Sequence, residues 1–319
     1  MMPVITGRKI LVAGGTGLVG ANLVPRLHAL GARVRATFHT VPPSQMTELF
    51  RQSDFTNAEA ALELARDMDD MIICAAHTAG IEAMRQRPTA DILPNIMIVA
   101  NLLEAARVHG LQRIVVLSST TVYQDLRRPI REEELDLNQP PHEAYLAVGG
   151  ANRFLEQLCS LYHKKFGLKI GILRPTSIYG PHDHFEPGRS HVLPALIRRA
   201  LAGERPFRVW GSPDVVRDFV YVDDVAEAIV QVLENYCACD PVNVGFGHGI
   251  TIGETVPLIL ELCGHSAEID YDVSQPTAIP YRAVNTDKLD RLQTGSPSRT
   301  PLREGLAKTI AWYRQTQLK

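Results

Sequence analysis

The chain has 319 residues, which is long enough for one large α/β domain or for two domains that share an interface. Hydrophobic residues make up 45% and charged residues 21%, the composition of an ordinary soluble globular protein. The formal net charge of −2 gives no general reason to expect binding to nucleic acid or to an anionic membrane. An anionic ligand would therefore need a local cluster of Arg side chains and backbone N–H groups.

The five cysteines are too few and too scattered for a disulfide framework. Cys237 and Cys239 form one close pair, without the second pair that would complete a zinc site, so we interpret them as free thiols. The N-terminal residues lack the apolar segment and cleavage site of a signal peptide, and no stretch approaches 18 continuous apolar residues. We expect a cytoplasmic protein.

Short β-branched runs alternate with longer helical patterns over the first half of the chain. The runs predict strands at Lys9–Ala13, Arg33–Phe38, Met71–Cys74, Ile114–Ser118 and Lys169–Leu173. The intervening patterns predict helices at Val19–Leu30, Asn57–Ala65, Pro94–His109 and Val148–Phe166. Almost unbroken Ile, Val and Leu strands that alternate with helices indicate a parallel sheet covered on both faces, the α/β Rossmann doubly wound architecture.

The second half changes to loops rich in Gly, Pro and His. Its predicted helices are Val192–Leu201, Val222–Glu234, Gly253–Cys263 and Pro301–Gln315. We interpret residues 1–175 as the doubly wound domain, to which a strand and a helix return from about residues 216–245, the strand near Pro241–Val244. The remainder, residues 176–319, is expected to form a smaller α/β substrate-binding lobe.

A glycine-rich turn follows the first predicted strand. It reads Gly14-Gly15-Thr16-Gly17-Leu18-Val19-Gly20 and leads into an apolar helix. Gly14 permits a tight turn, Gly17 lets the backbone approach a pyrophosphate, and Gly20 lets the helix pack close to the sheet. The N-terminus of this helix offers unpaired N–H groups and a positive dipole end to phosphates. The segment therefore predicts a nicotinamide-dinucleotide site.

The second predicted strand bears on the ribose of that dinucleotide. NAD sites place Asp or Glu at the end of this strand to hold the 2′-hydroxyl. Here the strand and the residues after it run from Arg33 to Thr40 without a carboxylate, and Arg35 or His39 could accept a 2′-phosphate. We expect NADP(H) to be favoured, with NAD(H) as the alternative.

Several segments resemble GDP-L-fucose synthases, which belong to the extended, sugar-modifying branch of the short-chain dehydrogenases/reductases. The glycine spacing resembles that branch, and further similar segments are Cys74–Ile81, Arg174–Asp183, Ser190–Leu196, Val209–Ser212 and Arg217–Val225. The resemblance covers nearly the whole chain. It implies an enzyme that binds a nicotinamide dinucleotide and a nucleotide-diphosphate sugar, and that catalyses epimerisation, reduction or dehydration.

The resemblance also implies roles for single residues. Asp54 resembles an adenine-contacting Asp, although it could instead cap the helix that begins near Asn57. Further expected cofactor contacts are Ala75, Ala76, His77, Asn152, Pro175 and Ser177. Expected substrate contacts are Ser177, His191, Trp210, Arg217, Arg282 and either Arg198 or Arg199. Arginine suits a diphosphate because its planar fork can bond two oxygens at once.

A histidine is expected to act in epimerisation. His191 follows Ser190, which we interpret as a helix N-cap, so the helix dipole is expected to lower the pKa of His191 and to favour a neutral imidazole that acts as a general base. His182, Asp183 and His184 lie in the same region, but the family uses this loop for sugar binding and we expect no metal there.

The family's Ser–Tyr–Lys catalytic set is not intact here. Ser119 occupies the serine position, and Thr121 stands where fucose synthases carry a cysteine. If Tyr145 is the family tyrosine, the lysine position of Tyr-x-x-x-Lys is Gly149.

If the helix is instead aligned from its C-terminal end, Val148 takes the tyrosine position and Asn152 takes the lysine position. We favour this second alignment slightly, because the amphipathic helix then keeps its packing and the three extra residues fall in the preceding loop. Neither alignment recovers the lysine, whose ammonium would stabilise a tyrosinate.

Three functions remain open. The first is an enzyme on a nucleotide-linked deoxyhexose with altered acid–base groups drawn from Ser119, Thr121, Tyr145 and His191. The second is a binding protein without catalysis, and the third is a non-redox reaction on another metabolite. The phosphate-binding arginines favour an enzyme. We also expect a homodimer through a four-helix bundle of Pro94–His109 and Val148–Phe166 with their copies.

Overall fold

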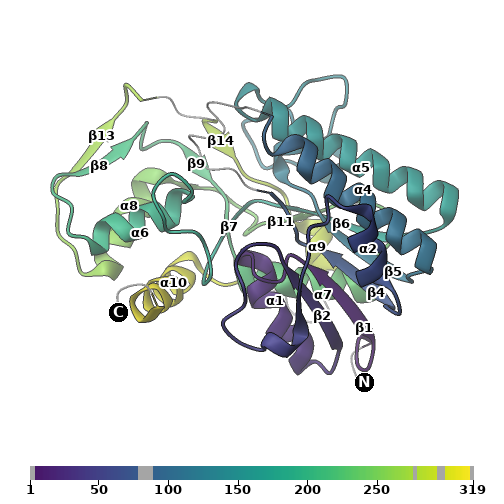
Figure 1. Cartoon of the computed structure of the whole chain (residues 1–319). Coiled ribbons are helices and arrows are strands. Elements are labelled where there is room, and N and C mark those ends of the chain that lie inside the picture. The colour runs from purple at the N-terminus through teal and green to yellow at the C-terminus, as the bar shows by residue number, and fades with distance from the viewer. Residues whose placement is uncertain (1–3, 78–88, 276–278, 293–298, 317–319) are drawn as a thin grey trace.

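The structure is a computed structural model that describes residues 4–77, 89–275, 279–292 and 299–316. A seven-stranded parallel sheet, ordered β11-β6-β5-β4-β1-β2-β3, forms its centre (Figure 1). The strands are β1 (Lys9–Ala13), β2 (Arg33–Phe38), β3 (Phe50–Gln52), β4 (Asp70–Ile73), β5 (Arg113–Leu117), β6 (Lys169–Pro175) and β11 (Val242–Val244). The strand order reverses between β1 and β4, which is where doubly wound sheets bind ligands at their carboxyl ends.

Helices cover both faces of this sheet. One face is covered by α1 (Leu18–Ala29) and α7 (Val222–Asn235), and the other by α2 (Ala58–Ala65), α4 (Ile92–His109) and α5 (Leu146–Phe166) (Figure 1). Successive side chains of β1 alternate between the two cores: Ile10 and Val12 join the first, Leu11 and Ala13 the second. Because both faces are buried, the strand is apolar from Ile10 to Ala13.

A third hydrophobic core lies in the C-terminal half of the chain. It is formed by α6 (Val192–Leu201), α8 (Ile252–Cys263) and α10 (Leu302–Thr316), together with the parallel pair β8 (Phe207–Trp210) and β13 (Ile269–Asp272). Figure 1 shows these elements at the end of the molecule away from α4 and α5. Short elements lie between the two parts: β7 (Ser177–Tyr179), β9 (Val216–Arg217), β10 (Phe219–Tyr221), β12 (Ile250–Thr251), β14 (Tyr281–Arg282) and α9 (Asp287–Leu292).

The predicted fold class is confirmed. The strand expected near Pro241–Val244 returns to the main sheet as β11, where it pairs with β6. Two helices begin earlier than predicted, α4 at Ile92 and α5 at Leu146. Neither β3 nor the short strands between the two parts were predicted, because strands of two to four residues are too short to show a period. The domain boundary at residue 175 stays a prediction.

The cysteines agree with the sequence interpretation, since all five thiols are free. Burial raises the pKa of the half-buried Cys74 thiol to about 12, so this thiol is protonated at neutral pH. Within the described residues, no helix is both long enough and apolar enough to cross a membrane.

Candidate functional site

The glycine turn between β1 and α1 leaves room for a ligand at one glycine only. Gly14 has a φ of +84°, and a β-carbon there would lie 2.6 Å from the backbone of Ala75. A β-carbon at Gly20 would overlap the carbonyl oxygen of Gly14. A β-carbon at Gly17 would meet just that same oxygen, at 3.6 Å, among the atoms the structure describes. The protein's own packing therefore requires Gly14 and Gly20, whereas the space beside Gly17 is open.

Gly17 is also the N-cap of α1, and no side chain caps the helix there. The first-turn N–H groups, including those of Leu18 and Val19, are therefore available to an anion. Thr16 is half-buried in the same turn. These features fit the pyrophosphate of a dinucleotide.

The end of β2 carries an exposed imidazole. Nε2 of His39 lies 4.0 Å from Oδ2 of Asp54. Asp54 accepts hydrogen bonds from the backbone N–H and the hydroxyl of Thr56, at 2.9 and 2.7 Å, and these bonds lower the pKa of Asp54. The helix cap is Asn57, whose side chain accepts from Glu59 N at 2.8 Å. Asp54 is therefore not the cap of α2, and it stands beside His39.

The Arg35 side chain hydrogen-bonds the end of a helix. Its guanidinium donates to the carbonyl oxygens of Leu64 and Arg66, at 2.9 and 3.1 Å, at the C-terminal end of α2. These carbonyls lack partners in the helix and attract the guanidinium. A contact of Arg35 with a 2′-phosphate stays a prediction. The other candidate, His39, has an exposed side chain just after the same strand.

The residues after β4 border the glycine turn. Ala75 lies against Gly14, and Ala76 and His77 follow it. His77 is fixed on two sides: its N–H donates to Asn95 Oδ1 at 2.6 Å, and its Nδ1 lies 2.7 Å from Asp91 Oδ1. The remainder of the similar segment, residues 78–81, lies outside the described residues.

A buried carboxylate organises the ends of β6 and β7. Pro175 ends β6, and the N–H of Ser177 donates to the carbonyl of Asp218 at 3.2 Å. The Asp218 side chain accepts from the N–H groups of Phe246 and Gly247, at 2.7 and 3.3 Å. Burial raises the pKa of Asp218 to about 6. The sequence pointed to this segment only through its resemblance, without a role for Asp218.

The serine and threonine of the expected catalytic set lie in one short turn after β5. Ser119 Oγ accepts from the N–H of Thr121 at 3.2 Å. On α5, a β-carbon at Gly149 would overlap the carbonyl oxygen of Thr121, and Asn152 Nδ2 donates to Thr121 Oγ1 at 3.3 Å. The structure therefore brings Asn152 to this turn, while Gly149 has no room for a side chain.

Tyr145 lies near two arginines of the site. It is the N-cap of α5, and it interacts electrostatically with Arg217 and Arg282. Among the described residues, Tyr145 and Ser119 share no hydrogen bond. Lys164 and Lys165 are in the last turn of α5, roughly 20 Å along the helix from Gly149 at about 1.5 Å per residue.

Two neighbouring arginines form a candidate anion-binding site. Arg217 on β9 and Arg282 on β14 are register partners in a parallel pair. Arg282 Nη1 donates to the carbonyl of Thr120 at 3.0 Å, whereas its Nε and Nη2 are buried without a hydrogen-bond partner in the described part of the chain. Burial lowers the pKa of both guanidinium groups, and the charge of Arg217 lowers that of Arg282 further.

That arrangement costs free energy unless a ligand completes it. A buried donor without a partner is destabilising by about 1–3 kcal/mol, and adjacent like charges repel. The Nε–Nη2 edge has the geometry that binds two oxygens of a phosphate. The pair can therefore hold a diphosphate.

Of the two arginines on α6, one is structural. Arg199 donates to Glu204 Oε2 at 2.6 Å, and its guanidinium lies 5.0 Å from the ring centre of Phe207. Arg198 keeps a buried Nε without a partner among the described residues. Trp210 at the end of β8 is 71% exposed, so its ring is open to a ligand and is not part of the core.

The helix position and the pKa of His191 both differ from the prediction. It is itself the N-cap of α6, one position outside the first turn, and its Nδ1 lies 3.5 Å from Asp183 Oδ1. This carboxylate raises the pKa of His191, although burial opposes the shift. The prediction of a lowered pKa is wrong, because the helix dipole was considered without the facing carboxylate.

The neighbouring histidines point to other partners. The ring of His182 lies 5.0 Å from that of Trp312, and Nδ1 of His184 lies 3.8 Å from Glu186. In the described ranges, no three His, Cys, Asp or Glu side chains are grouped as metal ligands.

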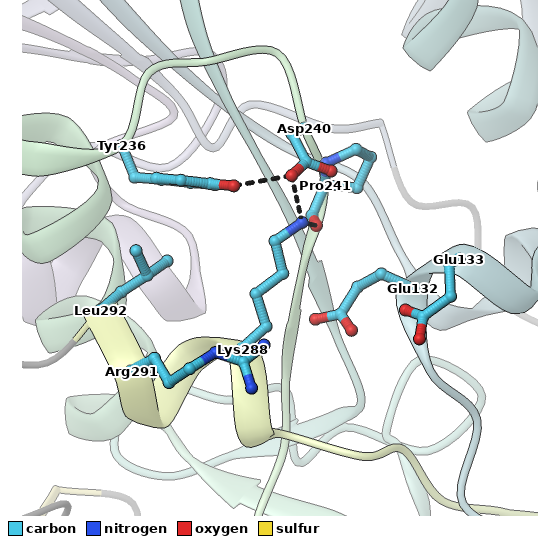
Figure 2. A pocket seen from close by; sticks show the side chains of 8 residues that line it. All are labelled: Glu132, Glu133, Tyr236, Asp240, Pro241, Lys288, Arg291 and Leu292. Atoms are coloured by element: carbon cyan, nitrogen blue, oxygen red, sulfur yellow. Dashed lines mark hydrogen bonds and ion pairs between the residues drawn. The ribbon is translucent and has the colours of Figure 1, made fainter.

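A separate pocket of about 470 Å³ contains none of these residues. Figure 2 shows Lys288 reaching Asp240, which Tyr236 also contacts; both contacts are 2.6 Å. Of the pocket's charged groups, Lys288 pairs with Asp240, and Glu132 accepts from the backbone N–H of Asn243 at 2.8 Å. Its lining is Glu132, Glu133, Tyr236, Asp240, Pro241, Lys288, Arg291 and Leu292.

Comparison with known proteins agrees with this geometry. The model of the NAD dependent epimerase/dehydratase family matches residues 10–245. Probable GDP-L-fucose synthase 1 of Oryza sativa subsp. japonica is 33% identical, covering 96% of this chain and 92% of that protein. GDP-L-fucose synthase of Escherichia coli is 30% identical, covering 97% of this chain and 98% of that protein.

Among solved structures, UDP-glucose 4-epimerase of Thermotoga maritima with UDP-glucose has a TM-score of 0.84 and 25% identity. The match covers 98% of this chain and 100% of that one. The sheet order, the glycine turn and the sequence matches lead to one conclusion. The chain belongs to the NAD dependent epimerase/dehydratase family, the extended branch of the short-chain dehydrogenases/reductases, and is similar to GDP-L-fucose synthases over nearly its full length.

Proposed function

We propose that this chain is an epimerase or reductase of a nucleotide-diphosphate sugar, with a GDP-linked deoxyhexose as the favoured substrate. The observation that carries the proposal is the unpartnered Nε–Nη2 edge of Arg282 beside Arg217. Buried Arg282 and half-buried Arg217 have no carboxylate partner in the described residues, and the negative groups of a diphosphate would supply one. The relatives' names supply the guanosine nucleotide and the sugar class.

Further side chains extend this substrate site. Tyr145 adds a hydroxyl beside the two arginines, and Arg198 adds a third guanidinium with a free Nε. The exposed ring of Trp210 offers a surface on which a base or sugar can stack. Ser177 lies between this site and the carboxyl edge of the main sheet.

The open space at Gly17 and the uncapped N-terminus of α1 fit a nicotinamide dinucleotide. When bound, this cofactor supplies hydride exchange with the sugar. His39 supports NADP(H), because a 2′-phosphate would pair with its imidazolium. NAD(H) remains the alternative, because the carboxylate of Asp54, with Oδ2 4.0 Å from Nε2 of His39, would bind a 2′-hydroxyl.

The acid–base groups are atypical. Asn152 stands beside Thr121 and takes the lysine position when the helix is aligned from its C-terminal end. Its neutral amide can hydrogen-bond a ribose hydroxyl but supplies no positive charge. Ser119 and Thr121 offer hydroxyl groups at the same turn, and His191 offers an ionisable imidazole. We assign proton transfer to His191 and positioning of the sugar to Ser119 and Thr121.

The test is direct. The purified chain is incubated with GDP-, UDP- and dTDP-linked 4-keto-6-deoxyhexoses and NADPH, and products are identified by mass spectrometry and NMR. We expect conversion of the GDP sugar, and loss of its binding in Arg282→Gln. Arg303→Gln is the matched control, because Arg303 is exposed on α10 and pairs with Glu261.

The uncharged Asn152 specifically favours a second function, nucleotide-sugar binding without redox turnover. Tight GDP-sugar binding that depends on Arg282, with no product from any sugar, would assign that function. Failure to bind any nucleotide sugar would refute both.

Apolar side chains that remain exposed on α4 and α5 support a homodimer. These two helices lie side by side along one edge of the molecule (Figure 1). Exposed apolar surface of this extent usually marks an interface. The residues are Leu93, Met97, Val108, Leu146, Phe154, Leu161 and Phe166.

A further inference from the structure

Asp183 and His191 form a pair across the loop between β7 and α6. Oδ1 of Asp183 lies 3.5 Å from Nδ1 of His191 and accepts from the N–H of His184 at 2.7 Å. The Asp183 side chain is 1% exposed, whereas that of His191 is 64% exposed. Oδ2 of Asp183 is buried without a hydrogen-bond partner in the described residues. A dehydrated carboxylate therefore contacts one edge of an imidazole that is otherwise open.

The charge of this carboxylate needs a cation. Burying an unpaired carboxylate is strongly unfavourable, and a paired one is stabilised only if its partner is charged. The other imidazoles of the loop have different neighbours, Trp312 for His182 and Glu186 for His184. His191 is the group in contact with Asp183, and the carboxylate raises the pKa of His191. The pair is therefore most stable as carboxylate and imidazolium.

The C-terminal helix fixes Asp183 from both sides. His182 has a φ of +69°, and its ring lies 5.0 Å from that of Trp312 on α10. Phe185 stacks on Tyr313 of the same helix with ring centres 4.2 Å apart. Because two anchors flank Asp183, its carboxylate has little freedom to turn away from His191.

The same loop is tied to the dinucleotide site. Asn22 on α1 donates to the carbonyls of Leu18 and Pro181, at 2.8 and 3.0 Å. Leu18 is the first residue of the helix that begins at the glycine turn. The loop that carries Asp183 therefore lies against the helix assigned to the cofactor.

We propose that Asp183 is a positioning residue that binds Nδ1–H of His191 and favours the protonated form of the imidazole, so that Nε2–H is the proton donor in turnover. The proton passes from Nε2 to the substrate atom that receives it, which leaves a neutral imidazole bonded to Asp183, and solvent then returns a proton to Nε2. The identity of the acceptor rests on the proposed function; the pairing and its charge do not.

The test is an NMR titration of the histidine ring protons in the full chain without substrate. The His191 signal is assigned from its loss in His191→Gln. We expect its midpoint in the wild type to lie above the reference value of about 6.5. In Asp183→Asn the midpoint should fall by about one unit or more.

Glu186→Gln is the matched control, since it removes the same charge from the same loop at an exposed side chain that faces His184. It should leave the His191 midpoint unchanged. A wild-type midpoint at or below about 6.5, or equal shifts in both variants, would overturn the proposal.

If Asp183→Asn does not fold, the wild-type midpoint tests the proposal by itself: a value above about 6.5 supports the proposal and a lower value overturns it. Once a substrate is known, the rate profile gives a second readout: turnover should lose its alkaline limb at lower pH in Asp183→Asn than in Glu186→Gln. An absence of nucleotide-sugar binding would refute the proposed function and leave the titration result standing.

Discussion

Gly149 of α5 packs directly on the carbonyl of Thr121: a β-carbon at residue 149 would overlap that oxygen and also lie 2.8 Å from Pro141 Cβ. This contact sets how closely the helix approaches the turn that carries Ser119. It also excludes a lysine at the position that an alignment from Tyr145 would require. The close approach explains a glycine inside a helix, where glycine is otherwise unfavourable.

Adjacent glycines make this contact testable. Gly149→Ala should destabilise the fold by about 1–3 kcal/mol, because backbone or α5 must shift to admit the methyl group. Gly150→Ala is the control, since nothing described lies within 4 Å of a β-carbon there, and it should stabilise by up to about 1 kcal/mol through helix propensity. Urea unfolding measures both. Equal effects of the two substitutions would show that α5 does not pack on Thr121 in this way.

The glycine turn gives a second pair of variants. Gly17→Asp should fold as well as the wild type but lose NADPH and NADH binding, because its carboxylate would enter the space assigned to the pyrophosphate and repel it. Gly20→Ala should lose stability, because its methyl group would overlap the Gly14 carbonyl. Thermal unfolding and fluorescence titration with each cofactor separate the two effects. Retained NADPH binding in a folded Gly17→Asp would place the cofactor elsewhere.

Cofactor preference follows from the end of β2. The wild type should bind NADPH at least as tightly as NADH, and His39→Asp should reverse the order, because a carboxylate repels a 2′-phosphate and bonds a 2′-hydroxyl. Titration of both variants with both cofactors is the measurement. Tighter NADH binding by the wild type would show that Asp54, not His39, governs the ribose.

The sequence was sufficient for the glycine turn and for all strands of the main sheet except β3, because these follow from local patterns. Apolar runs predict buried parallel strands, and the steric need for Gly14 and Gly20 lies within a few residues of each. The raised pKa of His191 could not be predicted in this way. It depends on Asp183, eight residues earlier and brought close by a loop whose shape is fixed by aromatic contacts to α10.

Tyr145 was ambiguous for a related reason. Sequence spacing gave two alignments, and the choice depends on where the loop before α5 ends. The structure starts the helix at Leu146 and places Tyr145 toward Arg217 and Arg282, which are brought together by pairing of β9 with β14. A local sequence pattern does not predict that β9 and β14, which are far apart in the chain, pair with each other.

Asp218 predicts a pH-dependent stability. Its folded pKa of about 6 exceeds the unfolded value of about 3.9, so the folded state binds more protons between these values. Stability contributed by this group therefore falls as pH rises from about 4 to about 6, by about 2–3 kcal/mol in total. Asp218→Asn should lack this fall, which urea unfolding at pH 4, 5, 6 and 7 would detect. Parallel pH profiles of the two proteins would contradict the assignment.

The dimer prediction concerns the exposed faces of α4 and α5. Light scattering at micromolar concentration should give twice the mass of one chain. Phe154→Asp with Leu161→Asp should give a folded monomer, because two charges would be buried at the interface. Val41→Asp, at an exposed apolar side chain after β2, should leave the dimer intact. A wild-type monomer would exclude this interface.

The final prediction concerns the missing lysine. If α5 is aligned from its C-terminal end, Val148→Tyr with Asn152→Lys should rebuild the family's acid–base pair, because Asn152 already contacts Thr121. Reduction of the accepted 4-keto sugar at pH 7 should then rise at least tenfold, within the range of about 10²–10⁴ that a positioned acid contributes.

Asn152→Lys alone is the first control, since it adds the ammonium without the phenol and should give little gain. Gly149→Lys, which pairs a lysine with Tyr145, should fail to fold, because its side chain would start inside the Thr121 carbonyl. NADPH oxidation and product analysis measure the rates, and cofactor titration checks that the site is intact. A gain in Gly149→Lys, or none in the double variant with cofactor binding preserved, would mean that Tyr145 is the family tyrosine and that α5 shifts to bring it to Ser119.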